Sequence, residues 1–227
     1  MQFAIFDLDH TLLPIDSGDA WTHFIIEQTG SDQSELKEKA VAINQGYRRG
    51  DFDAEDAVRF QMGLLSRFPR AALDAHRETF LETVVWPQIT DKALALVEDR
   101  RRAGFECVLA SGTHRYVSGR IAERFGIKYV VAATPEEDGA GNMTGALLGS
   151  HSYREGKVAL LKAFLEEKGA EDAKLEAYSD SINDLPLLTF VAQKGGRAVA
   201  VNADDALRAE AQKRGWETLE LFAKGKH

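Results

Sequence analysis

The residues most suggestive of chemistry are two carboxylates near the N-terminus. Asp7 and Asp9 follow the strand-like run Gln2–Phe6 and stand two positions apart. Two unit charges ~4 Å apart repel by about 4 kcal/mol at an effective dielectric near 20, so the pair needs a cation nearby. A divalent cation would relieve this repulsion and could also bind a phosphate oxygen. Acidic residues at strand ends also cap turns and helices, so the pair alone leaves both interpretations open.

Two further motifs could bind phosphate. Ser111 and Gly112 follow a second apolar run and offer a hydroxyl and a backbone N–H group at the start of a predicted helix. Lys157 lies in the first turn of another predicted helix, where the helix dipole disfavours a cation, so a nearby anion would explain it. The ordinary alternatives are a helix N-cap for Ser111 and a solvated surface charge for Lys157.

A third motif carries hard oxygen ligands. Asp180 follows an apolar run, and Asn183 and Asp184 come three and four residues later. Carboxylate oxygens are the ligands that Mg²⁺ prefers. The alternative is that Asp180 or Ser181 caps the helix that begins near Asn183.

The elements that must position these residues alternate between strands and helices. Apolar runs predict strands over residues 2–6, 105–110, 129–133, 175–179 and 198–201. Helical periodicity predicts helices over residues 92–103, 115–125 and 157–168. This order predicts an α/β fold with a parallel sheet covered on both faces, in which ligands bind beyond the carboxyl ends of the strands.

The segment after the first strand breaks this alternation. It lacks a convincing strand, and its periodicity predicts helices over residues 19–29, 34–45, 54–66 and 71–83. This is too long for a simple connection. We therefore expect a helical cap domain over residues 16–85, inserted in a core domain made of residues 1–15 and 86–227. Residues 134–150, rich in glycine and acidic side chains, are expected to form a hairpin or loop between core elements.

Taken in order, the motifs resemble those of the haloacid dehalogenase superfamily. The chain carries Asp7-Leu8-Asp9-His10-Thr11, then Ser111-Gly112, then Lys157, then Asp180-Ser181-Ile182-Asn183-Asp184. The helical insert after the first motif is similar to that of the phosphoserine-phosphatase-like branch, subfamily IB with a helical C1 cap. The resemblance covers nearly the whole chain and implies a Rossmann-like α/β core with an inserted α-helical cap.

The resemblance implies a catalytic role for five residues. Asp7 would be the nucleophile that forms an aspartyl phosphate, and Asp9 would act as general acid and then general base. Ser111 and the Gly112 N–H group would hold phosphoryl oxygens. Lys157 would balance the charge of the nucleophile and the phosphate.

The resemblance also implies a magnesium site. The Asp7 and Asp180 side chains and the Asp9 backbone carbonyl would bind Mg²⁺. Asp184 would orient these ligands without binding the ion directly. Asn183 would do the same or contact the substrate.

Two residues of the expected cap would select the substrate. Asp16 aligns with the glutamate that holds the substrate amine in phosphoserine phosphatases, and is one methylene shorter. Arg59 aligns with the arginine that holds the substrate carboxylate. The shorter acid puts phosphoserine in doubt and leaves histidinol phosphate as another amine-bearing candidate. Asp16 could equally cap the next helix, and Arg59 could be a solvated helix charge.

The expected function is that of a magnesium-dependent phosphomonoesterase acting on a small phosphorylated metabolite. A phosphotransferase that passes the phosphoryl group to an alcohol is one alternative. A regulatory module in which Asp7 is phosphorylated without turnover is another, and Asp9 argues against it because a pure acceptor needs no acid–base group.

Composition narrows the partners and the compartment. The net charge of −8 disfavours nucleic acid and anionic membrane surfaces as partners. The single cysteine, Cys107, lies in an apolar run and is expected to be a buried strand residue in a reducing compartment. No apolar stretch approaches the ~20 residues of a membrane span, and no signal peptide is recognised. These features predict a cytoplasmic protein and leave its oligomeric state open.

Overall fold

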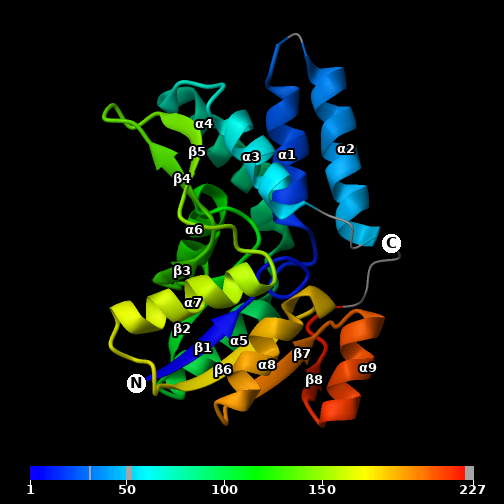
Figure 1. Cartoon of the computed structure of the whole chain (residues 1–227), viewed down its shortest axis with the longest axis vertical. Helices are drawn as coiled ribbons and strands as arrows, with labels where there is room; N and C mark the ends of the chain where they lie inside the picture. Colours follow the sequence, from blue (N-terminus) through cyan, green and yellow to red (C-terminus); the bar gives the residue numbers. More distant parts are fainter. Residues whose placement is uncertain (31, 50–52, 223–227) are drawn as a thin grey trace.

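A six-stranded parallel sheet lies in the lower half of the molecule as drawn in Figure 1. The computed structural model describes residues 1–30, 32–49 and 53–222. The sheet order is β3-β2-β1-β6-β7-β8. The strands are β1 (Gln2–Phe6), β2 (Glu106–Ala110), β3 (Tyr129–Val131), β6 (Lys174–Ser179), β7 (Arg197–Val201) and β8 (Glu217–Leu219). The predicted α/β class and five predicted strands are confirmed, and β8 is an addition. Cys107 is buried in β2, as expected.

Helices cover both faces of the sheet because alternate strand residues point to opposite sides. On one face, α5 (Asp91–Arg102) and α6 (Arg115–Arg124) bury Val97 and Ile121 with the even-numbered residues of β1. On the other, α7 (Glu155–Glu167), α8 (Leu185–Gln193) and α9 (Asp205–Arg214) pack against Phe3 and Ile5. A 3₁₀ turn, η3 (Ile182–Asp184), precedes α8. This sandwich leaves the carboxyl ends of the strands as the open edge.

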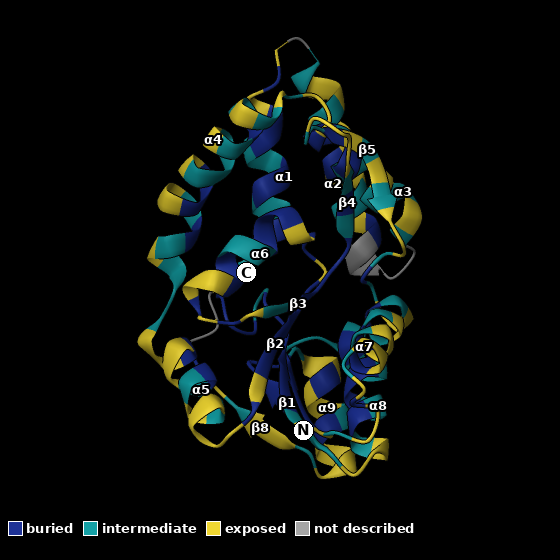
Figure 2. Ribbon diagram, turned by 90° about the vertical axis from the view of Figure 1, so that its left-hand side faces the viewer, coloured by how far each residue is buried: buried dark blue, intermediate teal, exposed yellow. Residues whose placement is uncertain are grey.

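Four helices lie over that edge, between β1 and α5 in the chain (Figures 1 and 2). They are α1 (Ser17–Glu27), α2 (Gln33–Arg49), α3 (Ala54–Leu65) and α4 (Arg70–Phe80). The π turn η1 (Leu81–Val85) and the 3₁₀ turn η2 (Trp86–Gln88) lead back to the sheet, so the helix predicted over residues 71–83 ends earlier than expected. Trp21 and Phe80 belong to the same buried cluster as Phe6, so the apolar core is continuous from the sheet into these helices.

The segment of residues 134–150 forms an antiparallel hairpin, β4 (Thr134–Glu137) and β5 (Met143–Leu148). As expected, the hairpin lies between core elements of the chain, β3 and α7, and its strand β5 packs against α3 (Figure 1). Gly145 has a φ of +88°, and a Cβ there would lie 3.1 Å from Ser66 Oγ at the end of α3. Glycine is therefore required for this close approach.

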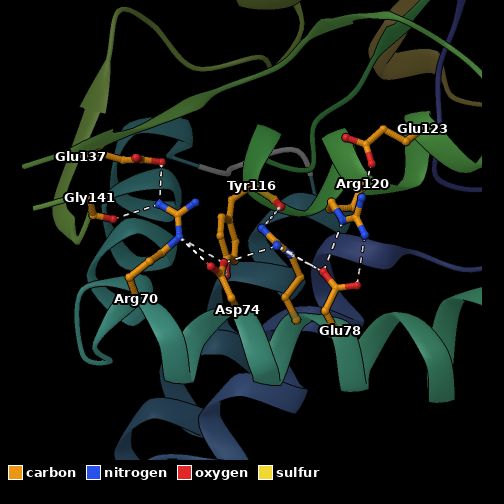
Figure 3. A network of polar contacts seen from close by, with 9 residues as sticks. Arg70, Asp74, Glu78, Tyr116, Arg120, Glu123, Glu137 and Gly141 are labelled. Atoms are coloured by element: carbon orange, nitrogen blue, oxygen red, sulfur yellow. Dashed lines mark hydrogen bonds and ion pairs between the residues drawn. The ribbon is translucent and has the colours of Figure 1, made fainter.

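A polar network ties α4 to the sheet domain (Figure 3). The Tyr116 hydroxyl of α6 donates to Asp74 Oδ1 at 2.7 Å, and Arg120 of α6 contacts Glu78 at 3.3 Å. Arg70 donates to Asp74 and also contacts Glu137 of β4 at 2.9 Å. These contacts hold α4 against both α6 and the hairpin. In the part of the chain that the structure describes, no helix is both long and apolar enough to cross a membrane.

Candidate active site

The centre of the candidate site is a buried ion-pair cluster at the end of β1. Lys157 Nζ donates to Asp7 Oδ1 at 2.9 Å and to Asp184 Oδ2 at 2.7 Å. Ser179 Oγ, at the end of β6, donates to the same Asp184 oxygen at 2.8 Å. These four side chains are buried. The ion pairs explain why a lysine occupies the first turn of α7, where the helix dipole opposes it.

The electrostatics of this cluster are dominated by the low polarity of the interior. Burial opposes the charge on Lys157, but the carboxylates of Asp184 and Asp7 outweigh it and raise the lysine pKa above its usual value. Burial also raises the pKa of Asp184, partly offset by Lys157. The single ammonium is thus held firmly in its charged form between two acids.

A third acid, Asp180, lies in this cluster and forms no ion pair with another described residue. Burial, with the nearby charges of Asp7 and Asp184, raises its pKa well above the usual value. Thr11 Oγ1 lies 3.1 Å from both Asp7 Oδ2 and Asp180 Oδ1 and bridges the two loops. Thr11 was noted only as part of the first motif. In the structure its hydroxyl lies between the two carboxylates and contacts both.

The donor set fits magnesium rather than a metal bound by side chains alone. Among the described residues, no three His, Cys, Asp or Glu side chains are arranged to hold an ion together. Mg²⁺ usually keeps several waters and binds through one or two carboxylates together with substrate phosphate. Asp7 and Asp180 provide that kind of pair, and the excess negative charge around them favours a cation.

Asp9 is held by three donors from two parts of the fold. Ser17 at the start of α1 donates its N–H group at 2.7 Å and its hydroxyl at 2.5 Å to Oδ1. Thr113 Oγ1, before α6, donates to Oδ2 at 2.7 Å. Burial, with the charges of Asp16 and Asp7, raises the pKa of Asp9 to about 7. An acid with such a pKa can carry a proton near neutral pH and also release it.

Ser17 and Thr113 were missed as site residues in the sequence. A weak signal existed for Thr113, since a hydroxyl directly follows Ser111-Gly112. A Cβ on Gly18 would lie 2.7 Å from Thr113 Oγ1, so the start of α1 approaches Thr113 closely. Ser111 itself is fully buried and its Oγ accepts the Thr113 N–H group at 3.0 Å.

A cavity of about 410 Å³ opens above these acids. Its floor includes Asp7, Asp9, Gly112, Lys157 and Asp180, all predicted from the sequence. The carboxyl ends of β1, β2 and β6 are adjacent in the sheet, so the motifs that follow them meet here. Ser111, which was expected to hold a phosphoryl oxygen, is fully buried and is not part of the cavity lining.

The other end of the cavity is lined by helix faces. The lining residues of α2 lie three and four positions apart, at Ala40, Ile43 and Asn44. The lining residues of α3 show the same spacing, with Gln61 four and three positions after Ala57 and Val58. Such spacings place side chains on one face of a helix. The side-chain amides of Asn44 and Gln61 form no hydrogen bond with another described residue, so they are available to a ligand in the cavity.

Asp16 reaches this cavity, and Arg59 does not. Asp16 lines the cavity and also caps α1 by accepting the Asp19 N–H group at 2.8 Å. Burial raises its pKa. The Arg59 side chain is 69% exposed and lies 3.8 Å from Asp56. This corrects the expectation for Arg59: the cavity face of α3 carries Ala57, Val58 and Gln61, and Arg59 is turned away from it.

Asn183 holds the rim of the cavity. Its Oδ1 accepts the Tyr153 hydroxyl at 3.0 Å and the Arg154 Nη2 group at 3.1 Å. All three residues line the cavity. Arg154 was not predicted, since it precedes the lysine motif without any pattern of its own. It adds a second cation to the half of the cavity that contains Lys157.

Comparison with known proteins places the chain in a family. The family model of haloacid dehalogenase-like hydrolases matches residues 4–189. A histidinol-phosphatase from Neisseria meningitidis serogroup C is 34% identical over 222 residues, covering 96% of this chain and 98% of that protein. A Bordetella pertussis Tohama I protein of unknown function has a solved structure with a TM-score of 0.89 and 36% identity, covering 98% of this chain and 100% of that one.

A more distant structure supports the same fold. A probable phosphoserine phosphatase from Vibrio cholerae, in unliganded form, has a TM-score of 0.65 and 23% identity, covering 98% of this chain and 61% of that one. The order of motifs, the parallel sheet and the helices over its open edge agree with these matches. The chain therefore belongs to the haloacid dehalogenase-like hydrolases, in their phosphoserine-phosphatase-like branch.

Proposed function

We propose that this haloacid dehalogenase-like phosphatase is a magnesium-dependent phosphomonoesterase that works through an aspartyl phosphate on Asp7. The observation that carries the proposal is the arrangement of Asp7, Asp9 and Lys157 on the floor of one cavity. Asp7 is fixed by an ammonium, and Asp9 is a separately held acid with a pKa of about 7. These are the groups that nucleophilic and acid–base catalysis require.

The proposed reaction has two steps. In the first, an Asp7 oxygen forms a bond to phosphorus while the bond from phosphorus to the alcohol oxygen breaks. Asp9 gives its proton to that alcohol oxygen. In the second, Asp9 takes a proton from water as the water oxygen attacks phosphorus. The bond to Asp7 breaks, and inorganic phosphate leaves.

Other residues would hold the phosphoryl group in place. The Gly112 N–H group and Lys157 would contact its oxygens, with Arg154 at the rim as a further cation. We propose that the Asp7 and Asp180 carboxylates and the Asp9 backbone carbonyl hold Mg²⁺, supported by Asp184. When bound, the ion would offset the negative charge of the acids and the phosphate.

We propose an amine-bearing phosphate ester as the substrate, with histidinol phosphate as the leading candidate. Asp16 places a carboxylate in the cavity, beyond the phosphate-binding floor, where an ammonium group would neutralise it. Asn44 and Gln61 offer amide groups to a polar ring or chain, and Ile43 and Val58 offer apolar walls. The relative from Neisseria meningitidis is named a histidinol-phosphatase, which favours this candidate. Residues 16–85 would form the substrate-selecting cap.

The direct test is phosphate release from histidinol phosphate, phosphoserine and p-nitrophenyl phosphate, each with Mg²⁺ and with a chelator. We expect metal-dependent release from all three and the highest kcat/KM for histidinol phosphate. Equal rates with the chelator would contradict the metal requirement. Transfer of phosphate to an added alcohol in place of water would indicate a phosphotransferase. Phosphorylation of Asp7 without release would indicate the regulatory module.

A matched pair of variants tests Asp16. Asp16→Asn removes the charge but keeps a good N-cap for α1. Asp56→Asn makes the same charge change on α3, where Asp56 pairs with Lys39 outside the cavity lining. We expect only the first variant to lose kcat/KM for the amine-bearing substrates, with p-nitrophenyl phosphate unaffected. An equal loss on all substrates would show that Asp16 has no recognition role.

A further inference from the structure

The turn of residues 202–204, between β7 and α9, contacts both loops that carry the acids of the candidate metal site. Its first residue, Asn202, reaches the loop after β1. Asn202 Nδ2 donates to the backbone carbonyl of His10 at 3.0 Å and lies 3.3 Å from that of Thr11. These two carbonyls directly follow Asp9 in the chain. The side chain of Asn202 thus fixes the backbone of the first motif.

The side-chain carbonyl oxygen of Asn202 binds the segment that follows β8. Its Oδ1 accepts the Leu221 N–H group at 2.7 Å, and its backbone N–H group donates to Leu219 at 2.8 Å. Asn202 is only 7% exposed and has a φ of +47°. Asparagine tolerates this left-handed conformation better than most residues. A buried amide with both ends bonded is a rigid connector, because breaking either end leaves an unpaired polar group.

The last residue of the turn, Asp204, reaches the loop after β6. Its N–H group donates to the Asp180 carbonyl at 2.8 Å. Its Oδ2 accepts the Ile182 N–H group at 2.9 Å, and its Oδ1 caps α9 through Leu207. The 202–204 turn is therefore bonded to the backbone on both sides of the cluster, at Thr11 and at Asp180.

We infer that Asn202 and Asp204 are positioning residues that set the separation of the Asp7–Thr11 loop from the Asp180 loop and so assemble the oxygen ligands for Mg²⁺. The inference rests on the proposed metal site. Mg²⁺ demands near-ideal octahedral geometry at ~2.0–2.1 Å, so small loop displacements weaken its binding. The side chain of Thr11 joins the two loops inside the site. The 202–204 turn joins them at its rear, by hydrogen bonds to the backbone groups of both loops.

The test is Mg²⁺ binding to the whole protein without substrate, measured by isothermal titration calorimetry. Asn202→Asp keeps the shape and the acceptor toward Leu221 but replaces the donor with an oxygen facing two carbonyls. Its added negative charge would by itself attract Mg²⁺, so weaker binding must come from displaced ligands. Asn202→Gly removes both contacts without adding charge and tolerates the positive φ. We expect both variants to raise the Kd for Mg²⁺ by ~10–100-fold.

A second variant tests the other contact of the turn. Asp204→Ser keeps a helix cap for α9 but is too short to reach the Ile182 N–H group as well. We expect ~10-fold weaker Mg²⁺ binding. The control is Val97→Ala in α5, which lowers stability from the far side of the sheet. It should leave Mg²⁺ binding unchanged.

The outcomes separate the positioning role from a merely structural one. Weaker Mg²⁺ binding in the Asn202 and Asp204 variants, with the wild-type affinity in Val97→Ala, supports the inference. A lowered Tm in all variants with wild-type Mg²⁺ affinity would overturn it. If the unmodified protein binds no Mg²⁺ and releases no phosphate, the proposed function fails first, and the inference fails with it.

Discussion

The two ends of the cavity are built on different principles. On the floor, each acid has a protein partner: Asp7 and Asp184 share Lys157, and Asp9 accepts bonds from Ser17 and Thr113. At the helix-lined end, the side-chain amides of Asn44 and Gln61 form no hydrogen bond with another described residue, and apolar side chains surround them.

This difference in hydrogen-bond pairing suits the two ends of the cavity to two tasks, the reaction and the selection of the substrate. Paired, buried groups hold a fixed geometry, which phosphoryl transfer requires. Polar groups left without partners in a cavity bind a ligand more favourably, because a ligand that pairs with them removes a cost. We therefore propose that the floor carries out the reaction and that the helix end selects the leaving group. The following predictions test this comparison, from the largest expected effect to the smallest.

Asp7→Asn should lower kcat by at least about 10⁴-fold on every substrate, because it removes the nucleophile. The fold should persist, since Lys157 keeps Asp184 as its partner. The measurement is kcat with p-nitrophenyl phosphate, with near-ultraviolet circular dichroism as the control for folding. Turnover above about one per cent of the wild-type rate would rule out Asp7 as the nucleophile.

Asp9→Asn should lower kcat by about 10²–10⁴-fold for an alkyl phosphate such as histidinol phosphate. The first step should suffer less with p-nitrophenyl phosphate, because nitrophenolate leaves without needing a proton. The check is the size of the rapid first release of nitrophenol in single-turnover experiments. An equal first-step defect with both kinds of leaving group would argue against a general acid at Asp9.

His114 is the exception to the pairing around the floor. It is buried, neither ring nitrogen has a hydrogen-bond partner among the described residues, and burial lowers its pKa to about 4. The unfolded chain takes up a proton near pH 6.5, whereas the folded chain does not until about pH 4. The contribution of His114 to stability is therefore complete above pH 6.5 and falls by about 3 kcal/mol as the pH drops through this window.

His114→Phe should remove that loss while keeping an aromatic ring of similar size. The measurement is the free energy of unfolding by urea between pH 7.5 and pH 4.5. His23→Gln, on the half-exposed side of α1, is the control and should retain the wild-type slope. Parallel stability curves for the wild type and His114→Phe would contradict the prediction.

Gln61→Leu should lower kcat/KM about tenfold for the amine-bearing substrate alone, since one hydrogen bond to the leaving group is lost. The rate with p-nitrophenyl phosphate should not change. Arg59→Met, on the outer side of the same helix, is the matched control and should leave all rates unchanged. A loss of kcat/KM in Arg59→Met would contradict this and indicate that Arg59 contacts the substrate.

The sequence by itself determined the α/β class and the floor of the cavity. Asp7 and Asp180 directly follow apolar runs, and residues that follow parallel strands meet at one edge of the sheet. The positions of Gly112 and Lys157 follow from the same order. The strands are buried on both faces, so the first polar residues after each apolar run lie at the edge of the sheet.

Only the tertiary structure decided which other residues reach the site. Arg59 and Gln61 lie two positions apart on α3, and the packing of that helix turned one outward and the other into the cavity. Ser17, Thr113, Asn202 and Asp204 lack any motif, and each acts through a contact with a residue distant in the chain or on another element. Such contacts depend on how helices and turns pack together, which no local spacing in the sequence records.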